Sequence, residues 1–200
     1  MLFPAEELEL SVVFRSSLTL MALALAVGSC DREADRAVQQ EEKSAPAKQE
    51  LSGELDCSQA GMLMPDVLVR DPDGRELNLA AVQGTPTLIN LWATWCAPCI
   101  TEMPMLDNLA DIMGDELRVI TVSQDLQGAQ LVEPFFEKSQ FRNLQPWLDP
   151  DAQLGQAFGD RGMPVTVLFD ANGQEVFRVT GGYEWDGEEA IAAVREAIAG

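Results

Sequence analysis

The stretch that decides the fold class is residues 86–104, which read Pro-Thr-Leu-Ile-Asn-Leu-Trp-Ala-Thr-Trp-Cys-Ala-Pro-Cys-Ile-Thr-Glu-Met-Pro. Residues 87–92 are apolar and partly β-branched, as a buried strand requires. Cys96 and Cys99 follow after a short break, and apolar residues then recur at helical spacing as far as Met113. The cysteine pair is therefore predicted to lie where a strand ends and a helix begins.

This position favours redox chemistry at the pair. The first turn of a helix has free backbone N–H groups and a partial positive charge, and both favour a thiolate over a thiol. The pKa of the Cys96 thiol is therefore expected to be lowered, which makes Cys96 the attacking sulfur. Cys99 lies one turn along and can resolve the mixed disulfide. Between them lie Ala97 and Pro98, and Pro98 stiffens the turn and suits the start of a helix.

Other kinds of CxxC site fit this sequence less well. A zinc site needs further ligands, but the chain has no second CxxC and no histidine. Attachment of a c-type haem needs a histidine at position 100, where the chain has Ile100. A purely structural disulfide would close a loop too short to give much entropic stabilisation. We therefore predict a redox-active disulfide, Cys96–Cys99, with no metal and no cofactor.

Composition bounds the class of protein. Two hundred residues with 46% hydrophobic side chains indicate one globular domain with additional segments at its ends. The net charge of −20 argues against nucleic-acid binding, because phosphates would be repelled, and it favours partners with basic faces. Simple solubility, or a salt-adapted source, explains the same charge equally well.

The N-terminal segment has the features of an export signal. Residues 18–27 are apolar, Arg15 lies just ahead of them, and the run is shorter than the about 20 residues of a spanning helix. Because three glutamates precede the run, we hypothesise that translation begins near Val12 or Val13. Residues 27–30 resemble a bacterial lipobox, which implies that Cys30 is lipidated. An ordinary cleaved signal with a chance cysteine is the alternative.

The remaining patterns predict one α/β domain. We assign residues 1–30 to a signal peptide with a lipobox, 31–56 to an acidic flexible tether and 57–200 to the folded domain, whose first element is expected near 61–65. Turn signals at 71–74 and 170–173 each predict a β-hairpin. The first hairpin joins segments 67–70 and 76–79. Further strands are expected at 86–92, 117–122, 143–148, 164–169 and 174–180, and helices at 97–113, 129–140, 151–158 and 187–199.

Four blocks of sequence, at residues 90–99, 102–106, 162–170 and 180–185, together resemble the thioredoxin superfamily. They are most similar to its TlpA/ResA branch of periplasmic, membrane-anchored thiol:disulfide oxidoreductases, and within that branch to TlpA-type members. The similarity runs from about residue 63 to the C-terminus. It implies a thioredoxin fold, in which helices flank a central mixed β-sheet, with an N-terminal β-hairpin and a central insertion near residues 125–150.

The resemblance also implies roles for particular residues. Pro164 becomes the cis-proline that faces the disulfide and leaves the backbone of Met163 free to pair with a substrate strand. Trp95 is expected at the rim of the site, where it could contact substrate, and Trp92 in the packing beneath.

Two positions depart from the resemblance. Asn90 replaces the buried aspartate of thioredoxin, so the proton of the Cys99 thiol must go to water or to another carboxylate, with Glu102 the nearest in sequence. An exposed place on the helix surface is an equally good interpretation of Glu102. TlpA has a second disulfide whose later cysteine falls where this chain has Gln174, so Cys57 has no evident partner.

These observations predict a lipid-anchored thiol:disulfide oxidoreductase on the periplasmic side of the bacterial inner membrane. It would reduce target disulfides through Cys96–Cys99 and be reduced by a membrane thiol reductase upstream. The resemblance implies copper-site proteins of cytochrome oxidase or apocytochromes c as targets, and the sequence does not choose between them. The alternative is a metal-binding or redox-inactive adaptor on the same fold.

Overall fold

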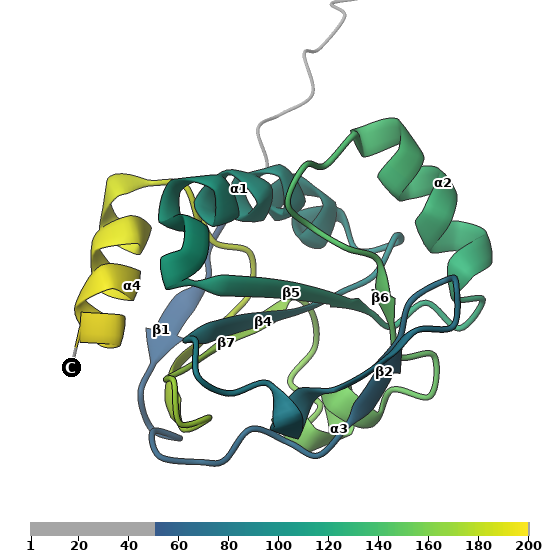
Figure 1. The fold of residues 1–200 in the computed structure, drawn as a ribbon. Coiled ribbons are helices and arrows are strands. Elements are labelled where there is room, and N and C mark those ends of the chain that lie inside the picture. Colours follow the sequence, from purple (N-terminus) through teal and green to yellow (C-terminus); the bar gives the residue numbers. More distant parts are fainter. Residues whose placement is uncertain (1–50, 200) are drawn as a thin grey trace, which may run out of the picture. The chain divides into compact units, whose positions relative to one another are not determined.

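The structure, a computed structural model, describes residues 51–199 and is built on one eight-stranded sheet. The strand order is β1-β8-β7-β4-β5-β6-β2-β3 (Figure 1). The strands are β1 (Glu54–Asp56), β2 (Leu68–Arg70), β3 (Glu76–Asn78), β4 (Thr87–Trp92), β5 (Arg118–Ser123), β6 (Trp147–Leu148), β7 (Val165–Phe169) and β8 (Glu175–Thr180). The helices are η1 (Leu79–Ala81), α1 (Ala97–Met113), η2 (Gly114–Glu116), α2 (Ala129–Ser139), α3 (Gln153–Phe158) and α4 (Glu188–Ala199).

Strand β4 is the centre of the sheet, because all six of its residues are buried. It pairs in parallel with β5 and antiparallel with β7, so the sheet is mixed. Its side chains alternate between two separate cores: Leu88 and Trp92 belong to one, and Ile89 and Leu91 to the other. An apolar run of this length is therefore explained by burial on both faces.

Helices cover both faces of the sheet. Helices α1, α2 and α4 contribute to the core that contains Trp92, whereas η1 and α3 contribute to the core that contains Ile89. Figure 1 shows α1 and α4 on one side of the sheet and α3 on the other. The predicted α/β class and thioredoxin-like architecture are thus confirmed.

The two predicted hairpins are present. β2 and β3 pair antiparallel across residues 71–74, where the Asp71 carboxylate accepts a hydrogen bond from the backbone N–H of Arg75 at 2.8 Å. β7 and β8 pair across residues 170–173, where the N–H of Gly173 donates to the carbonyl of Asp170 at 3.0 Å. The first hairpin joins the sheet through β6, which pairs with both β2 and β5. Only Trp147 and Leu148 of the expected strand 143–148 form that link.

The folded domain begins before residue 57, which is earlier than predicted. Residues 54–56, assigned above to the tether, form β1 and pair antiparallel with β8. The N–H of Gly53 extends this pairing by donating to the carbonyl of Gly182 at 2.8 Å. This segment is short and acidic, and it has no alternating apolar pattern. It forms a strand because its backbone pairs with β8, and not because of its own composition.

The predicted signal peptide, the lipobox cysteine Cys30 and the tether up to residue 50 lie outside the described residues. Among residues 51–199, no helix combines the length and apolar composition that crossing a bilayer requires.

The edge pairing of β1 gives a first prediction. A methyl group at position 53 would lie 2.7 Å from the Gly181 carbonyl oxygen and 2.8 Å from Val179 Cγ1, closer than the packing permits. Gly53→Ala should therefore lower the unfolding free energy of the full chain by about 1–3 kcal/mol, as overpacking does elsewhere. Urea denaturation of the oxidised protein measures this, with exposed Ser52→Ala as the matched control. Equal midpoints for both variants would contradict the pairing.

Candidate active site

The two cysteines of the CxxC motif are joined in a disulfide at the N-terminus of α1. Cys96 is the residue that precedes the helix, in extended conformation, and no side chain caps the helix end. Its carbonyl accepts the first helical hydrogen bond from the N–H of Ile100 at 3.0 Å. Cys99 is fully buried, whereas Cys96 retains 6% exposure. Only Cys96 can therefore be reached by a large partner, and it has the free N–H groups of the helix start beside it.

The two tryptophans beside the motif have different environments. Trp92 is completely buried against Phe135 and Phe136 of α2, with ring centroids 5.0 and 6.0 Å away. Trp95 is 68% exposed and lies next to Cys96 in the chain. The first packs the site from below and the second lies at its rim, as predicted.

Glu102 is buried beneath the disulfide, one helical turn after Cys99. Its side chain is fully inaccessible and receives three hydrogen bonds: from Asn90 Nδ2 at 2.7 Å, from the Tyr183 N–H at 3.0 Å and from Trp185 Nε1 at 3.3 Å. Burial raises the pKa of its carboxyl to about 7, although the three donors oppose this shift. The interpretation of Glu102 as an exposed helix residue is thus wrong.

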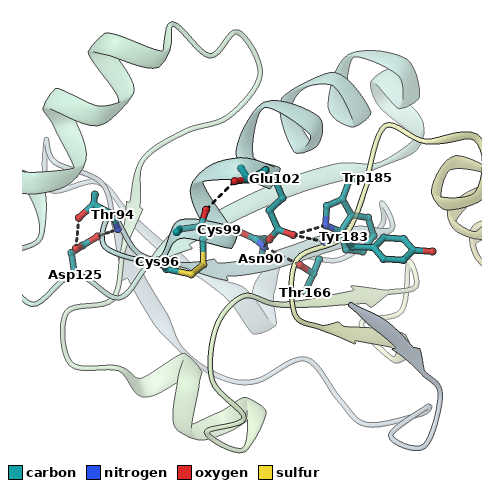
Figure 2. The surroundings of a disulfide bond; sticks show 11 residues. Asn90, Thr94, Cys96, Cys99, Glu102, Asp125, Thr166, Tyr183 and Trp185 are labelled. Atoms are coloured by element: carbon teal, nitrogen blue, oxygen red, sulfur yellow. Dashed lines mark hydrogen bonds between the residues drawn. A yellow bond between two sulfur atoms is a disulfide. The ribbon is translucent and has the colours of Figure 1, made fainter. Parts of the chain in front are cut away.

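Asn90 holds Glu102 in place. Its side-chain nitrogen donates to Glu102 and also to Thr166 Oγ1 at 2.9 Å, which joins β4, α1 and β7 (Figure 2). The aspartate that the resemblance places at position 90 would have repelled the Glu102 carboxylate at this distance. The amide therefore allows a carboxylate to come from α1 in place of one from β4.

The loop before β7 contains the Met163–Pro164 pair. The Met163–Pro164 peptide bond is cis, as predicted. Met163 is half-buried and borders a hollow of about 210 Å³ that Arg161, Asp160 and Phe158 also line.

A third loop meets the motif at Pro98. A Cβ built on Gly182 would lie 3.3 Å from Pro98 Cβ and 2.7 Å from Leu51 Cδ2. The segment ahead of β1 therefore lies next to the residues between the two cysteines. Leu51, which lies in the segment predicted to be a tether, therefore contributes to the border of the site.

Comparison with known proteins agrees with this geometry. The redoxin family model matches residues 59–194 of the chain. The chain belongs to the redoxin family.

Curated relatives of this chain include proteins named thiol-disulfide oxidoreductases. The thiol-disulfide oxidoreductase ResA of Geobacillus thermodenitrificans is 34% identical over 125 residues, which are 60% of this chain and 69% of the relative. The ResA of Geobacillus kaustophilus is 32% identical over the same shares of the two chains. The exposed lipoprotein thioredoxin Etrx1 of Streptococcus pneumoniae, 24% identical, shares the fold with a TM-score of 0.57 over 66% of this chain and 99% of that one. This redoxin is therefore a TlpA/ResA-like thiol:disulfide oxidoreductase.

Sequence reasoning missed several residues of the redoxin site. Tyr183 and Trp185 lie in the block 180–185 that supported the resemblance, but nothing in their spacing links them to Glu102, 81 and 83 positions earlier. Thr166 gave no signal either, because a threonine in a strand is ordinary. Cys57 is exposed and has no disulfide partner among the described residues.

The raised pKa of Glu102 predicts a pH-dependent stability. The folded state binds this proton more tightly than the unfolded state, so the stabilisation is complete below about pH 4.5 and is lost as pH rises to about 7. Relative to Glu102→Gln, the oxidised wild-type chain should lose about 3 kcal/mol of unfolding free energy between pH 4.5 and 8. Urea denaturation across this range measures the difference. A constant difference between the two proteins would show that Glu102 does not titrate here.

Proposed function

We propose that this redoxin is a reductant of protein disulfides, in which Cys96 is the nucleophile, Cys99 the resolving thiol and Glu102 the proton acceptor. The observation that carries the proposal is the buried Glu102 carboxylate beside the buried end of the disulfide (Figure 2). A carboxyl group whose pKa is about 7 changes its protonation state in the range where a general base is most useful.

The reaction takes two exchange steps. The Cys96 thiolate attacks one sulfur of a target disulfide, which forms a mixed disulfide and releases the first target thiolate. Glu102 then accepts the proton of the Cys99 thiol, and the Cys99 thiolate attacks Cys96 Sγ and releases the second target sulfur. The target gains two electrons and the Cys96–Cys99 pair is oxidised. A membrane thiol reductase returns two electrons to the pair and restores both thiols.

The direction of electron flow is argued from what surrounds Cys96. A strong oxidant of this fold needs a reduced form that is unusually stable. Here the residues between the cysteines, Ala97 and Pro98, offer no side-chain donor to the Cys96 thiolate, and the chain has no histidine. We therefore place the couple near a reducing thioredoxin.

Three features present a target polypeptide to Cys96. The exposed Trp95 supplies an apolar contact, the backbone of Met163 can pair with an extended strand, and the hollow beside Met163 accepts a side chain. The targets we propose are disulfide-bearing copper-site proteins or apocytochromes c. We place this protein on the periplasmic side of the inner membrane, because residues 27–30 resemble a lipobox and Asp31 resembles the signal for retention in the inner membrane.

The reduction potential tests the direction of the reaction. The full chain carrying Cys57→Ser would be equilibrated against glutathione and dithiothreitol, with Cys96–Cys99 quantified by mass spectrometry. We expect a value near about −270 mV, the value for thioredoxin. A value above about −180 mV would make the protein an oxidant or isomerase and would overturn the proposal.

The substrate class is tested with the reduced full chain. It should reduce an oxidised copper-site protein or a disulfide-bonded apocytochrome c in a stoichiometric assay, and Cys99→Ser should stop at a trapped mixed disulfide. The adaptor alternative predicts copper binding by the reduced protein without disulfide reduction. Reduction of neither target class, with tight copper binding, would favour that alternative.

The membrane anchor gives a separate prediction. Expressed with its own N-terminus in a Gram-negative host, the protein should be labelled by a radioactive fatty acid and sediment with membranes, because two or more acyl chains hold a protein stably at a bilayer. Cys30→Ser should remove the label, and Cys57→Ser should retain it. Labelling that persists in Cys30→Ser would exclude this cysteine as the attachment site.

A further inference from the structure

A second buried carboxylate, Asp125, lies on the other side of the disulfide from Glu102. It follows β5 by two residues and is 1% exposed. Figure 2 shows the disulfide between two hydrogen-bonded groups, Asp125 with Thr94 on one side and Glu102 with its partners on the other. The redox chemistry described above does not use Asp125.

Asp125 is bonded to the segment that carries the nucleophile. One carboxylate oxygen, Oδ2, accepts from the backbone N–H of Thr94 at 2.9 Å and from Ser123 Oγ at 2.8 Å. The other, Oδ1, accepts from Thr94 Oγ1 at 2.7 Å. The carboxylate thus accepts hydrogen bonds from both the backbone and the side chain of Thr94, two positions before Cys96.

The segment held in this way is a tight turn. The N–H of Cys96 donates to the carbonyl of Ala93 at 3.1 Å, so Thr94 and Trp95 are the two central residues of the turn. Asp125 fixes the first of them. The second, Trp95, projects its side chain into solvent, and the turn ends at Cys96. A loop that presents a nucleophile and an exposed aromatic side chain is anchored at one point.

The anchor also carries charge. All three partners of the Asp125 carboxylate are neutral donors, and no cation forms an ion pair with it among residues 51–199. A negative charge near a thiol disfavours the thiolate. The expected effect of this charge is to oppose the helix N-terminus at Cys96, and a weaker stabilisation of the thiolate makes the reduced form less stable.

We infer that Asp125 is a positioning residue for the redox reaction, which holds the Thr94–Trp95 turn in place and keeps the Cys96–Cys99 couple reducing. This inference rests on the proposed role of Cys96 as nucleophile. It attributes the low reduction potential that we propose for the pair to a residue 26 positions beyond Cys99.

Two substitutions should change the pKa of the Cys96 thiol in opposite directions. Asp125→Asn removes the charge together with one acceptor oxygen, and the loss of the charge should lower the Cys96 pKa by about 1. The equilibrium with glutathione should then shift up to tenfold toward the reduced protein, which corresponds to about 30 mV. Thr94→Val removes one donor and keeps the charge, so the Cys96 pKa should rise. Thr94→Ser retains the hydroxyl and should behave as wild type.

The measurement uses the reduced full chain. Iodoacetamide alkylation is followed from pH 4 to 10 and located by peptide mass spectrometry, which gives the pKa of Cys96 separately from the other cysteines. The potential is measured on the same variants. Asp149→Asn is the matched control, because Asp149 is also buried and also accepts three hydrogen bonds, but from Gln124, Gln153 and Leu154.

Opposite shifts in Asp125→Asn and Thr94→Val, with Thr94→Ser and Asp149→Asn unchanged, would support the inference. A merely structural role would lower thermal stability in both variants and leave the Cys96 pKa and the potential as in wild type, which would overturn it. If Asp125→Asn does not fold, the Thr94→Val and Thr94→Ser pair decides, and equal pKa values in that pair overturn it. Alkylation of Cys99 in place of Cys96 would instead contradict the proposed function.

Discussion

The site depends on the burial of one carboxylate, Glu102. An ionised carboxylate inside a protein is unfavourable unless donors replace the water it loses. Here the donors come from β4, through Asn90, and from the loop before α4, through the Tyr183 backbone and the Trp185 indole. These contacts bring the loop before α4 against α1 and hold the Glu102 carboxylate one helical turn after Cys99. The same group thus joins three segments, and it is the proton acceptor in the reaction we propose. Its ionisation above pH 7 lowers the stability of the fold.

The second organising feature is that the disulfide lies at a meeting point of loops. The turn 93–96 is fixed by Asp125, the loop before β7 contributes Met163, and the loop after β8 places Gly182 against Pro98. These loops follow β4, precede β7 and follow β8, which are neighbouring strands, so the sheet sets the distances between the loops. A redox-active pair needs this precision because attack on a target disulfide requires three sulfur atoms in line.

Local sequence was sufficient to predict the elements whose structure depends on residues close together in the chain. Strand β4, helix α1 and both hairpin turns follow from apolar periodicity and from Asp, Asn, Pro and Gly at turn positions, and all four are present. Edges were harder. β1 has no pattern of its own, and β6 is only two residues long, because both are strands by virtue of a neighbour's unpaired backbone groups.

The sequence by itself determined the redox-active pair, because a strand, a helix start and two cysteines lie within residues 86–104. It also determined the fold class and the family, because four blocks of sequence between residues 90 and 185 occur in the order that the resemblance requires. Only the tertiary structure decided the surroundings of the cysteines. The sequence left Glu102 open between a proton acceptor and an exposed helix residue, and the structure shows that it is buried. The structure also pairs Glu102 with Asn90, Tyr183 and Trp185, and it brings Asp125 to Thr94. The physical reason is that the pKa of a carboxyl group is set by burial and by hydrogen bonds, and both join residues that are far apart in the chain.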